Sequence, residues 1–351
     1  MKVRPNIARM GAYSPPLESR TDRDYLLLDF NESTVPPSPA VVEAITGFLR
    51  RGLLRAYPAY GRFGERLAAY TGLPPACTLL ANGSDQAIEV VMRALLEPGD
   101  EVVFPVPGFA IFPQIAGVQG AELVSPRYRD DMSFPFEEVV AAVTPRTRLI
   151  VVINPNNPTG TSASEAQVRE LLGRFPEVAV LVDEAYHEFT GRTVAPLVRE
   201  HDNLVVTRTF SKAFALAGLR LGYALSNAAF IRELHKVRGP YDVNMLAVQG
   251  AEAALAHPEG WRDYVAEVMT RAKPMVERFF TEHGVPFVRG EANFMLVRPP
   301  DVAAACAFLR ERGILVRPQR EPVADMFRLS VGTTADMQRF MAAFADYLAQ
   351  V

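Results

Sequence analysis

Residues 207–223 read Thr-Arg-Thr-Phe-Ser-Lys-Ala-Phe-Ala-Leu-Ala-Gly-Leu-Arg-Leu-Gly-Tyr, and this stretch decides how the rest of the chain is interpreted. The apolar run 204–206 before it predicts a buried strand, so Lys212 follows a strand end. A lysine that loses its proton can form a Schiff base, and partial burial beside a cation favours that loss. Groups able to hold a phosphate surround it: Thr209, Ser211 and Arg220. A lone Ser-Lys pair would instead indicate surface residues, so other motifs must decide.

A second motif, Asn154-Pro155-Asn156-Asn157-Pro158-Thr159-Gly160, follows the apolar run 148–153. As turn chemistry it requires no function, because Asn, Pro and Gly end strands and build turns. The carboxyl end of a parallel strand is also where α/β sheets bind ligands. An asparagine side chain there can donate a hydrogen bond to a ring oxygen.

A third motif, Val182-Asp183-Glu184-Ala185-Tyr186, ends the apolar run 178–182. A carboxylate placed directly after a buried run is costly unless it is paired. The pyridinium nitrogen of pyridoxal phosphate (PLP) would pair with Asp183 and stay protonated, which lets the ring act as an electron sink. Tyr186 could donate to the phenolate oxygen of that ring. The alternative is a helix cap at Asp183, a solvated Glu184 and a packing Tyr186.

Two weaker signals join these motifs. Asn82-Gly83-Ser84-Asp85 stands at a strand-to-helix junction, where backbone amides bind anions and glycine permits close approach. Alone it is an ordinary N-cap, but beside Lys212 it becomes a plausible phosphate cradle. Phe109, in Pro107-Gly108-Phe109, is placed either to stack on a ring or to fill a core.

Two arginines near the C-terminus follow or open apolar strand signals. Arg317 follows the run 314–316, and Arg328 opens Arg328-Leu329-Ser330-Val331-Gly332-Thr333. A strand-borne arginine can hold a carboxylate or a phosphate through two hydrogen bonds. Taken singly, each would more often form a surface salt bridge.

Composition excludes several functional classes. The chain has 351 residues, 49% of them hydrophobic, which is enough for a large core and suggests two domains. A net charge of -3 without a basic stripe argues against nucleic acid. No apolar signal region or membrane-length apolar window occurs, so we expect no membrane partner. Cys77 and Cys306 are not spaced as metal ligands, so we expect no metal site and a reduced, cytoplasmic location.

The order of apolar runs predicts the architecture. Short runs alternate with helical segments at 78–81, 101–104, 121–124, 148–153, 178–182, 203–207 and 220–225. This alternation favours an α/β fold with a seven-stranded, mainly parallel sheet covered on both faces. We expect an N-terminal arm over 1–45 that joins the small domain and a dimer interface. We expect the large, PLP-binding domain over 46–245 and a small α+β domain over 246–351.

Taken together and in this order, the motifs resemble fold-type I PLP-dependent aminotransferases of class I and II. Within that group the chain is most similar to the histidinol-phosphate aminotransferase family. The resemblance runs from about Asn31 to Thr333. Its most specific parts are Leu54-Arg55-Ala56-Tyr57-Pro58, Pro155-Asn156-Asn157-Pro158-Thr159-Gly160, Asp183-Glu184-Ala185-Tyr186, the Lys212 run and Arg328-Leu329-Ser330-Val331-Gly332-Thr333.

The resemblance implies a role for each candidate residue. Lys212 would be the Schiff-base lysine, and Asp183 and Tyr186 would complete the catalytic set. Asn157 and Tyr186 would contact the ring hydroxyl, and Phe109 would stack on the ring. The residues that match the positions around the cofactor phosphate are Gly83, Ser84, Asp85, Thr209, Ser211 and Arg220.

The resemblance also implies substrates and an assembly. Arg328 would hold the carboxylate of glutamate, and Arg317 the phosphate of histidinol phosphate, with 2-oxoglutarate as the acceptor. Tyr13 and Asn31 would line the substrate pocket. Tyr57 matches a tyrosine that reaches the cofactor phosphate of the neighbouring subunit, which implies a homodimer.

Several departures from the family pattern lie near the substrate pocket. Gln86 stands where an acid is common, Asp242 where asparagine is frequent, and Phe109 and Phe112 where tyrosines are common. The stretch 317–322 lacks the usual glycines. Three alternatives therefore stay open: an aromatic amino acid aminotransferase, a decarboxylase like that of threonine phosphate, and a PLP-binding regulatory module without a DNA-binding motif.

Overall fold

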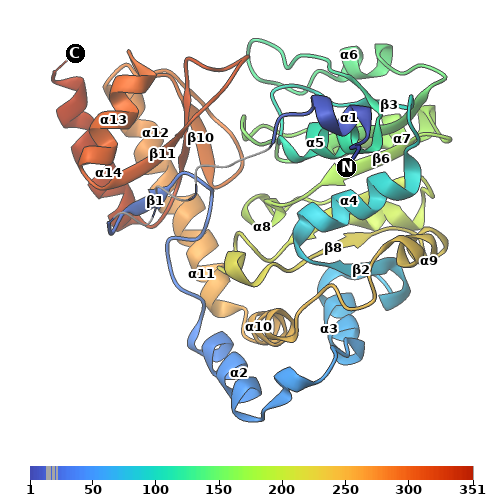
Figure 1. Cartoon of the computed structure of the whole chain (residues 1–351). Coiled ribbons are helices and arrows are strands. Elements are labelled where there is room, and N and C mark those ends of the chain that lie inside the picture. Colours follow the sequence, from blue (N-terminus) through green and yellow to red (C-terminus); the bar gives the residue numbers. More distant parts are fainter. Residues whose placement is uncertain (13–16, 18–19, 21–22, 351) are drawn as a thin grey trace.

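The computed structural model describes residues 1–12, 17, 20 and 23–350, and it contains two sheets (Figure 1). The larger sheet has seven strands in the order β2-β8-β7-β6-β5-β3-β4. Only β8 runs antiparallel to its neighbours. This confirms the predicted α/β fold with a mainly parallel sheet. The strands are β2 Thr78–Ala81, β3 Glu101–Val103, β4 Glu122–Val124, β5 Thr147–Ile153, β6 Ala179–Asp183, β7 Leu204–Thr209 and β8 Gly222–Leu225.

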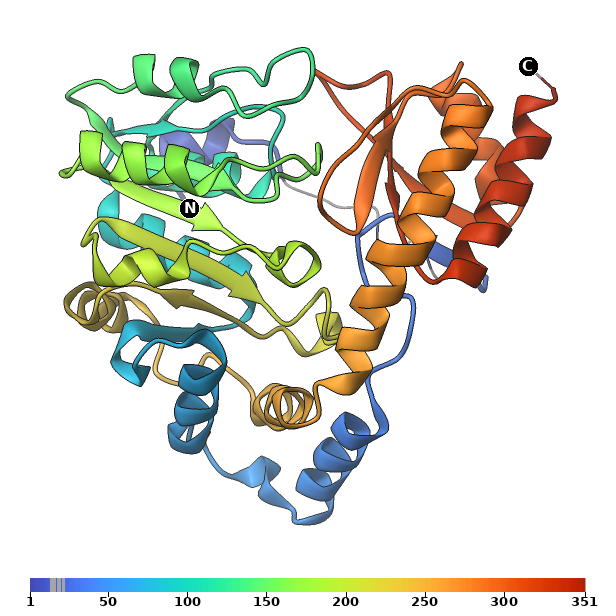
Figure 2. The same cartoon turned by 180° about the vertical axis from the view of Figure 1, so that it is seen from behind.

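Both faces of this sheet are covered by helices, which explains why most residues of its central strands are apolar. Along β5, Leu149 and Val151 belong to one apolar cluster and Ile150 and Val152 to the other. The first cluster includes α4 (Gly83–Leu95), α5 (Ile111–Gln119) and α9 (Ala228–Val237). The second includes α3 (Gly61–Thr71), α6 (Phe136–Ala141), α7 (Glu165–Arg174), α8 (His187–Thr190) and α10 (Met245–Ala256), and Figure 2 shows this side from behind.

The smaller sheet has five strands in the order β1-β11-β12-β10-β9. Its first strand, β1 (Leu26–Leu28), comes from the N-terminal arm and pairs in parallel with β11. The other strands are β9 Phe287–Val288, β10 Phe294–Val297, β11 Ile314–Pro318 and β12 Phe327–Ser330. The helices that accompany this sheet are α12 Lys273–Glu282, α13 Val302–Glu311 and α14 Thr334–Leu348.

The connection between the two sheets is helical. α11 (Glu259–Glu267), a π-helical turn (Val268–Ala272) and α12 follow one another without a break. α2 (Pro39–Arg50) packs against α10. The predicted division at residue 45 falls within α2, and the predicted division at residue 245 falls at the start of α10. Near the N-terminus, α1 (Pro5–Arg9) contacts α5. The domain limits drawn from the sequence stay a prediction.

None of the helices in the described part of the chain combines the length and apolar character that a membrane span needs. The same residues contain no group of three or more His, Cys, Asp or Glu side chains that could hold a metal ion.

Candidate active site

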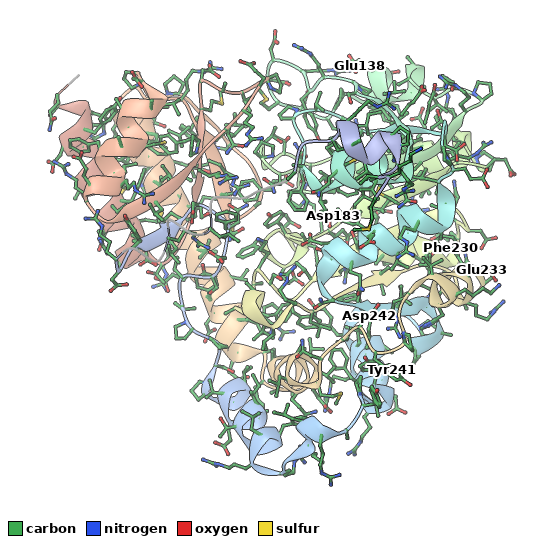
Figure 3. All side chains as sticks on the ribbon, viewed as in Figure 1. Glu138, Asp183, Phe230, Glu233, Tyr241 and Asp242 are labelled. Atoms are coloured by element: carbon green, nitrogen blue, oxygen red, sulfur yellow. The ribbon has the colours of Figure 1, made fainter. Side chains whose placement is uncertain are left out.

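The candidate site lies at the carboxyl ends of three neighbouring parallel strands. β5 leads into the turn 154–160, β6 ends at Asp183, and Lys212 comes three residues after β7. Neighbouring parallel strands end at the same edge of a sheet, and such an edge is where α/β folds bind ligands. Figure 3 labels Asp183 at this position.

The amine of Lys212 points toward the N-terminal arm. Its Nζ atom donates a hydrogen bond of 2.8 Å to the backbone oxygen of Phe30. It also lies 5.8 Å from the centroid of the Tyr186 ring. The lysine is therefore held where the arm crosses the edge of the large sheet.

Asp183 is a buried acid whose hydrogen-bond partners are uncharged. Only 3% of it is exposed, and it accepts from the Thr207 hydroxyl at 3.0 Å and from the backbone of Ala185. Burial above all raises its pKa from 3.8 to about 7, and the nearby carboxylates of Asp85 and Glu184 act in the same direction. A protonated ring nitrogen would supply the missing cation, so this carboxylate fits the pyridine end of PLP.

Glu184 is not solvated, contrary to the structural alternative for its motif. It is 1% exposed and pairs with the buried Arg208 at 2.8 Å. Its Oε1 atom also accepts from the backbone of Val194 at 2.6 Å. Successive residues of a strand face opposite sides, so Arg208 lies on the face opposite Thr207 and Thr209. The ion pair therefore fastens the ends of β6 and β7 from behind the candidate site.

The predicted phosphate-binding residues converge where α4 begins. Gly83 has φ +82°. A Cβ on Gly222 would lie 2.3 Å from the amide nitrogen of Ser84, so the close approach of β8 to this turn requires glycine at position 222. Arg220 lies against Gly83 and donates to Asp85 at 3.0 Å. Asp85 therefore orients the guanidinium, whose charge suits a phosphate.

Two hydroxyls complete this group. The Thr209 hydroxyl donates to that of Ser211 at 2.9 Å, and Thr209 is the register partner of Gly222. Backbone amides, hydroxyls and an arginine form a donor set that fits a phosphate.

The candidate substrate residues contact the turn after β5 and the N-terminal arm. Arg328 donates to the Asn157 side chain and, at 2.7 Å, to the backbone oxygen of Asp29. Arg317 is its register partner on β11, so both side chains are on one face of the small sheet. The Asn31 amide donates to the Tyr186 hydroxyl at 3.0 Å. The side-chain oxygen of Asn157 accepts the hydrogen bond from Arg328, so the side-chain NH2 group of Asn157 is the part that can donate to a ligand.

Among the described residues, no hydrogen bond, ion pair or ring contact joins Tyr57 or Phe109 to Lys212 or Asp183. Tyr57 is 79% exposed and stacks on Tyr241, with 4.5 Å between ring centroids. Phe109 packs at the edge of the cluster that contains α4 and α5. Tyr13 lies outside the described residues.

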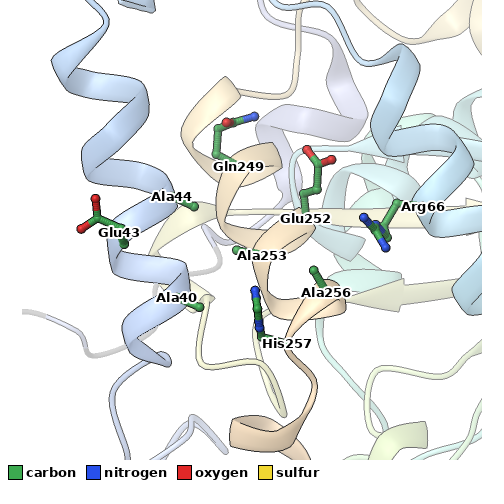
Figure 4. A pocket seen from close by; sticks show the side chains of 9 residues that line it. All are labelled: Ala40, Glu43, Ala44, Arg66, Gln249, Glu252, Ala253, Ala256 and His257. Carbon is green, nitrogen blue, oxygen red and sulfur yellow. The ribbon is translucent and has the colours of Figure 1, made fainter.

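The segment that carries Tyr57 joins α2 to α3, beside a groove of about 530 Å³ (Figure 4). This groove shares no residue with the site described above. Its lining comes from α2, α3 and the α10 end: Ala40, Glu43, Ala44, Arg66, Gln249, Glu252, Ala253, Ala256 and His257.

Sequence reasoning missed two participants. Thr207, which holds Asp183, could have been found from strand alternation, because it lies two residues before Thr209 on the same face. Phe30 contributes a backbone oxygen to Lys212, and backbone groups leave no signal in the side-chain sequence.

Comparison with known proteins places the chain in a family. The family model "Aminotransferase class I and II" matches residues 23–344. The histidinol-phosphate aminotransferase of Geotalea daltonii is 34% identical over 351 residues, covering 99% of each chain. The dihydroxyacetone phosphate transaminase of Campylobacter jejuni is also 34% identical, covering 96% of this chain and 95% of its own.

A solved structure extends the likeness to three dimensions. The histidinol-phosphate aminotransferase of Sinorhizobium meliloti, in complex with pyridoxal-5'-phosphate, superposes with a TM-score of 0.89 at 26% identity, covering 99% of this chain and 98% of the other. The family match spans most of the chain, and the full-length relatives exceed 30% identity. The chain belongs to the class I and II aminotransferases.

Proposed function

We propose that the chain is a PLP-dependent transaminase that exchanges an amino group between glutamate and a phosphate-bearing substrate, with histidinol phosphate as the first candidate. The observation that carries the proposal is the buried carboxylate of Asp183, with uncharged partners, at the same sheet edge as Lys212. Burying an acid without a cation is unfavourable, and the cofactor ring would relieve that cost.

Each group of the site has a task in this reaction. When bound, PLP supplies a ring that withdraws electrons from the substrate Cα. Asp183 would hold the proton on the ring nitrogen, and Asn157 and Tyr186 would orient the ring through its hydroxyl. Lys212 would bond the cofactor covalently until the amino group of the substrate takes its place. The amine of Lys212 released in this exchange would then move the proton from the substrate Cα.

The phosphate of the cofactor would be held by the group around the start of α4. We assign this role to Gly83, Ser84, Asp85, Thr209, Ser211 and Arg220. Phe109 would cover the ring from the side of the α4 and α5 cluster. Tyr57 would reach the phosphate of the neighbouring subunit.

The two strand-borne arginines carry the substrate part of the proposal. Arg328 lies beside Asn157 and would hold the carboxylate of glutamate. Arg317, its neighbour across the strands, would hold the phosphate of the second substrate. Asn31 would line the same pocket through its contact with Tyr186.

Dihydroxyacetone phosphate is a second candidate substrate. A relative named for it is as similar to this chain as one named for histidinol phosphate. Both compounds carry a phosphate ester, so both suit a cationic pocket. They differ in size and in the imidazole ring.

We also propose a homodimer. Large apolar side chains are exposed on α2, on the segment that joins α2 to α3 and on the loop that contacts this segment, namely Val42, Leu49, Leu54, Tyr57 and Tyr241. An exposed apolar patch of this kind marks an interaction surface. The two free thiols, Cys77 and Cys306, suit the cytoplasm.

A half-reaction screen tests the proposal. The PLP form of the protein is mixed with glutamate, histidinol phosphate, phenylalanine or tyrosine, and the visible absorption of the bound cofactor is followed. A second screen starts from the amine form and adds 2-oxoglutarate or dihydroxyacetone phosphate. Reaction with glutamate and one phosphate ester is expected. Reaction with aromatic amino acids alone, or release of CO2, would replace the proposal with one of the alternatives.

A further inference from the structure

Gln86, on the first turn of α4, links two segments that are far apart in the sequence. Its Oε1 atom accepts a hydrogen bond of 2.6 Å from the backbone nitrogen of Asn82. Its Nε2 atom donates one of 2.8 Å to Oδ2 of Asp242, 156 residues away. The amide therefore uses its acceptor on the turn that begins α4 and its donor on the loop that carries Asp242.

That loop is fastened in turn to the segment of Tyr57. Tyr241 stacks on Tyr57 with an interplanar angle of 28°. The hydroxyl of Tyr60 donates to the backbone oxygen of Val243 at 2.9 Å and accepts from its nitrogen at 3.3 Å. Figure 3 shows Tyr241 and Asp242 next to each other on this loop. An unbroken series of contacts thus joins the phosphate turn to Tyr57.

The local backbone is adapted to the position of Asp242. A Cβ added to Gly239 would lie 2.1 Å from its Oδ1 atom, so the carboxylate folds against a position where only hydrogen fits. Any larger residue at 239 would force the carboxylate away from Gln86.

An acid facing an amide gives one charged acceptor and one donor, whichever side carries the acid. Two carboxylates at these positions would repel, because neither has a proton to donate.

We infer that Gln86 and Asp242 form a positioning pair that sets Tyr57 relative to the cofactor-phosphate turn. The inference rests on the proposed function, which assigns the turn to one cofactor and Tyr57 to the neighbouring subunit's cofactor. The pair thereby couples the phosphate site of one subunit to the residue that completes the other. It touches neither cofactor directly, so its loss weakens cofactor retention through geometry.

The test is a double-mutant cycle on the holoenzyme, read as the PLP dissociation constant. Q86E places two carboxylates face to face and should weaken PLP binding about tenfold. D242N keeps one neutral hydrogen bond and should cost about threefold or less. The double variant restores an acid and an amide in the reverse order and should return to within about threefold of wild type.

Control measurements separate positioning from folding. Gln338 is exposed on α14, and Q338E adds the same charge without effect on PLP binding. The apoproteins should melt alike, because the pair acts on cofactor geometry. Additive effects in the double variant, or a fall in apoprotein stability that parallels the loss of PLP affinity, would overturn the inference.

The outcomes also distinguish the inference from the function beneath it. If the wild type takes up no PLP, the proposed function and the pair fail together. If the wild type binds PLP and transaminates while Q86E binds PLP equally well, only the positioning pair is refuted.

Discussion

Replacing Asp183 with asparagine tests the buried acid in the protein without cofactor. In the folded chain the pKa of Asp183 is about 7, against an ordinary value of 3.8. The folded state therefore holds this proton more tightly than the unfolded state does. Its contribution to stability is present at low pH and is lost as pH rises from about 4 to about 7. The neutral asparagine suffers no such loss.

The size of the effect follows from the two pKa values. Each unit of difference corresponds to about 1.4 kcal/mol, so the whole shift is worth up to about 4 kcal/mol. Because part of it is already lost at pH 5, about 3 kcal/mol remains to be lost between pH 5 and pH 8. Over that interval the apoprotein of Asp183→Asn should gain this much stability relative to the wild-type apoprotein.

Urea unfolding of both apoproteins at the two pH values measures the difference, since other titrating groups cancel in the comparison. Asp346→Asn, at an exposed carboxylate on α14, is the matched control and should show no relative change. Parallel stability curves for Asp183→Asn and wild type would refute the buried-acid argument. Although Asp183→Asn should stabilise the apoprotein at high pH, it should make transamination by the holoenzyme much slower, because the ring nitrogen loses its anionic partner.

Further substitutions test the other assignments. Lys212→Ala should still bind PLP reversibly, since the phosphate contacts remain, but should lose roughly 10²- to 10⁴-fold in transamination rate; borohydride labelling of the wild type at any other lysine would contradict the assignment. Arg328→Ala should raise the barrier of the glutamate half-reaction by about 2–3 kcal/mol, as expected for hydrogen bonds between charged groups. Arg317→Ala should impair the reaction with the phosphate ester more than the one with glutamate; equal losses in stopped-flow measurements would assign Arg317 to the rim. Mixing Tyr57→Ala with Lys212→Ala subunits should recover roughly a quarter of the wild-type activity, because half of a symmetric random mixture carries one intact site of two; no recovery would mean that Tyr57 serves its own subunit.

Much of the fold and part of the site could be predicted from local sequence. Continuous apolar runs separated by helical segments indicated a parallel sheet with both faces covered, and the seven strands lie where those runs occur. Lys212 and Asp183 could be located because the end of a strand is visible in the sequence. Parallel strands bring such ends to one edge without further information.

Contacts between distant segments depend on how the sheets and helices pack, and no local pattern encodes them. The bond from Arg328 to Asn157 spans 171 positions and joins the small sheet to a turn of the large one. The sequence equally allowed a solvated Glu184, and only the approach of β7 to β6 buries it against Arg208.

The same distinction explains the two departures at Gln86 and Asp242. In the sequence Gln86 and Asp242 are two unrelated departures from the pattern of the family that the chain resembles, and each weakens the substrate assignment. In the tertiary structure their side chains meet, and the amide of Gln86 donates a hydrogen bond to the carboxylate of Asp242. The sequence alone determined the fold class and the places of Lys212 and Asp183 at the strand ends, because both follow from local patterns of burial. Tertiary packing decided which side chains are partners in hydrogen bonds and ion pairs, because these interactions form only at the short distances that the folded chain sets.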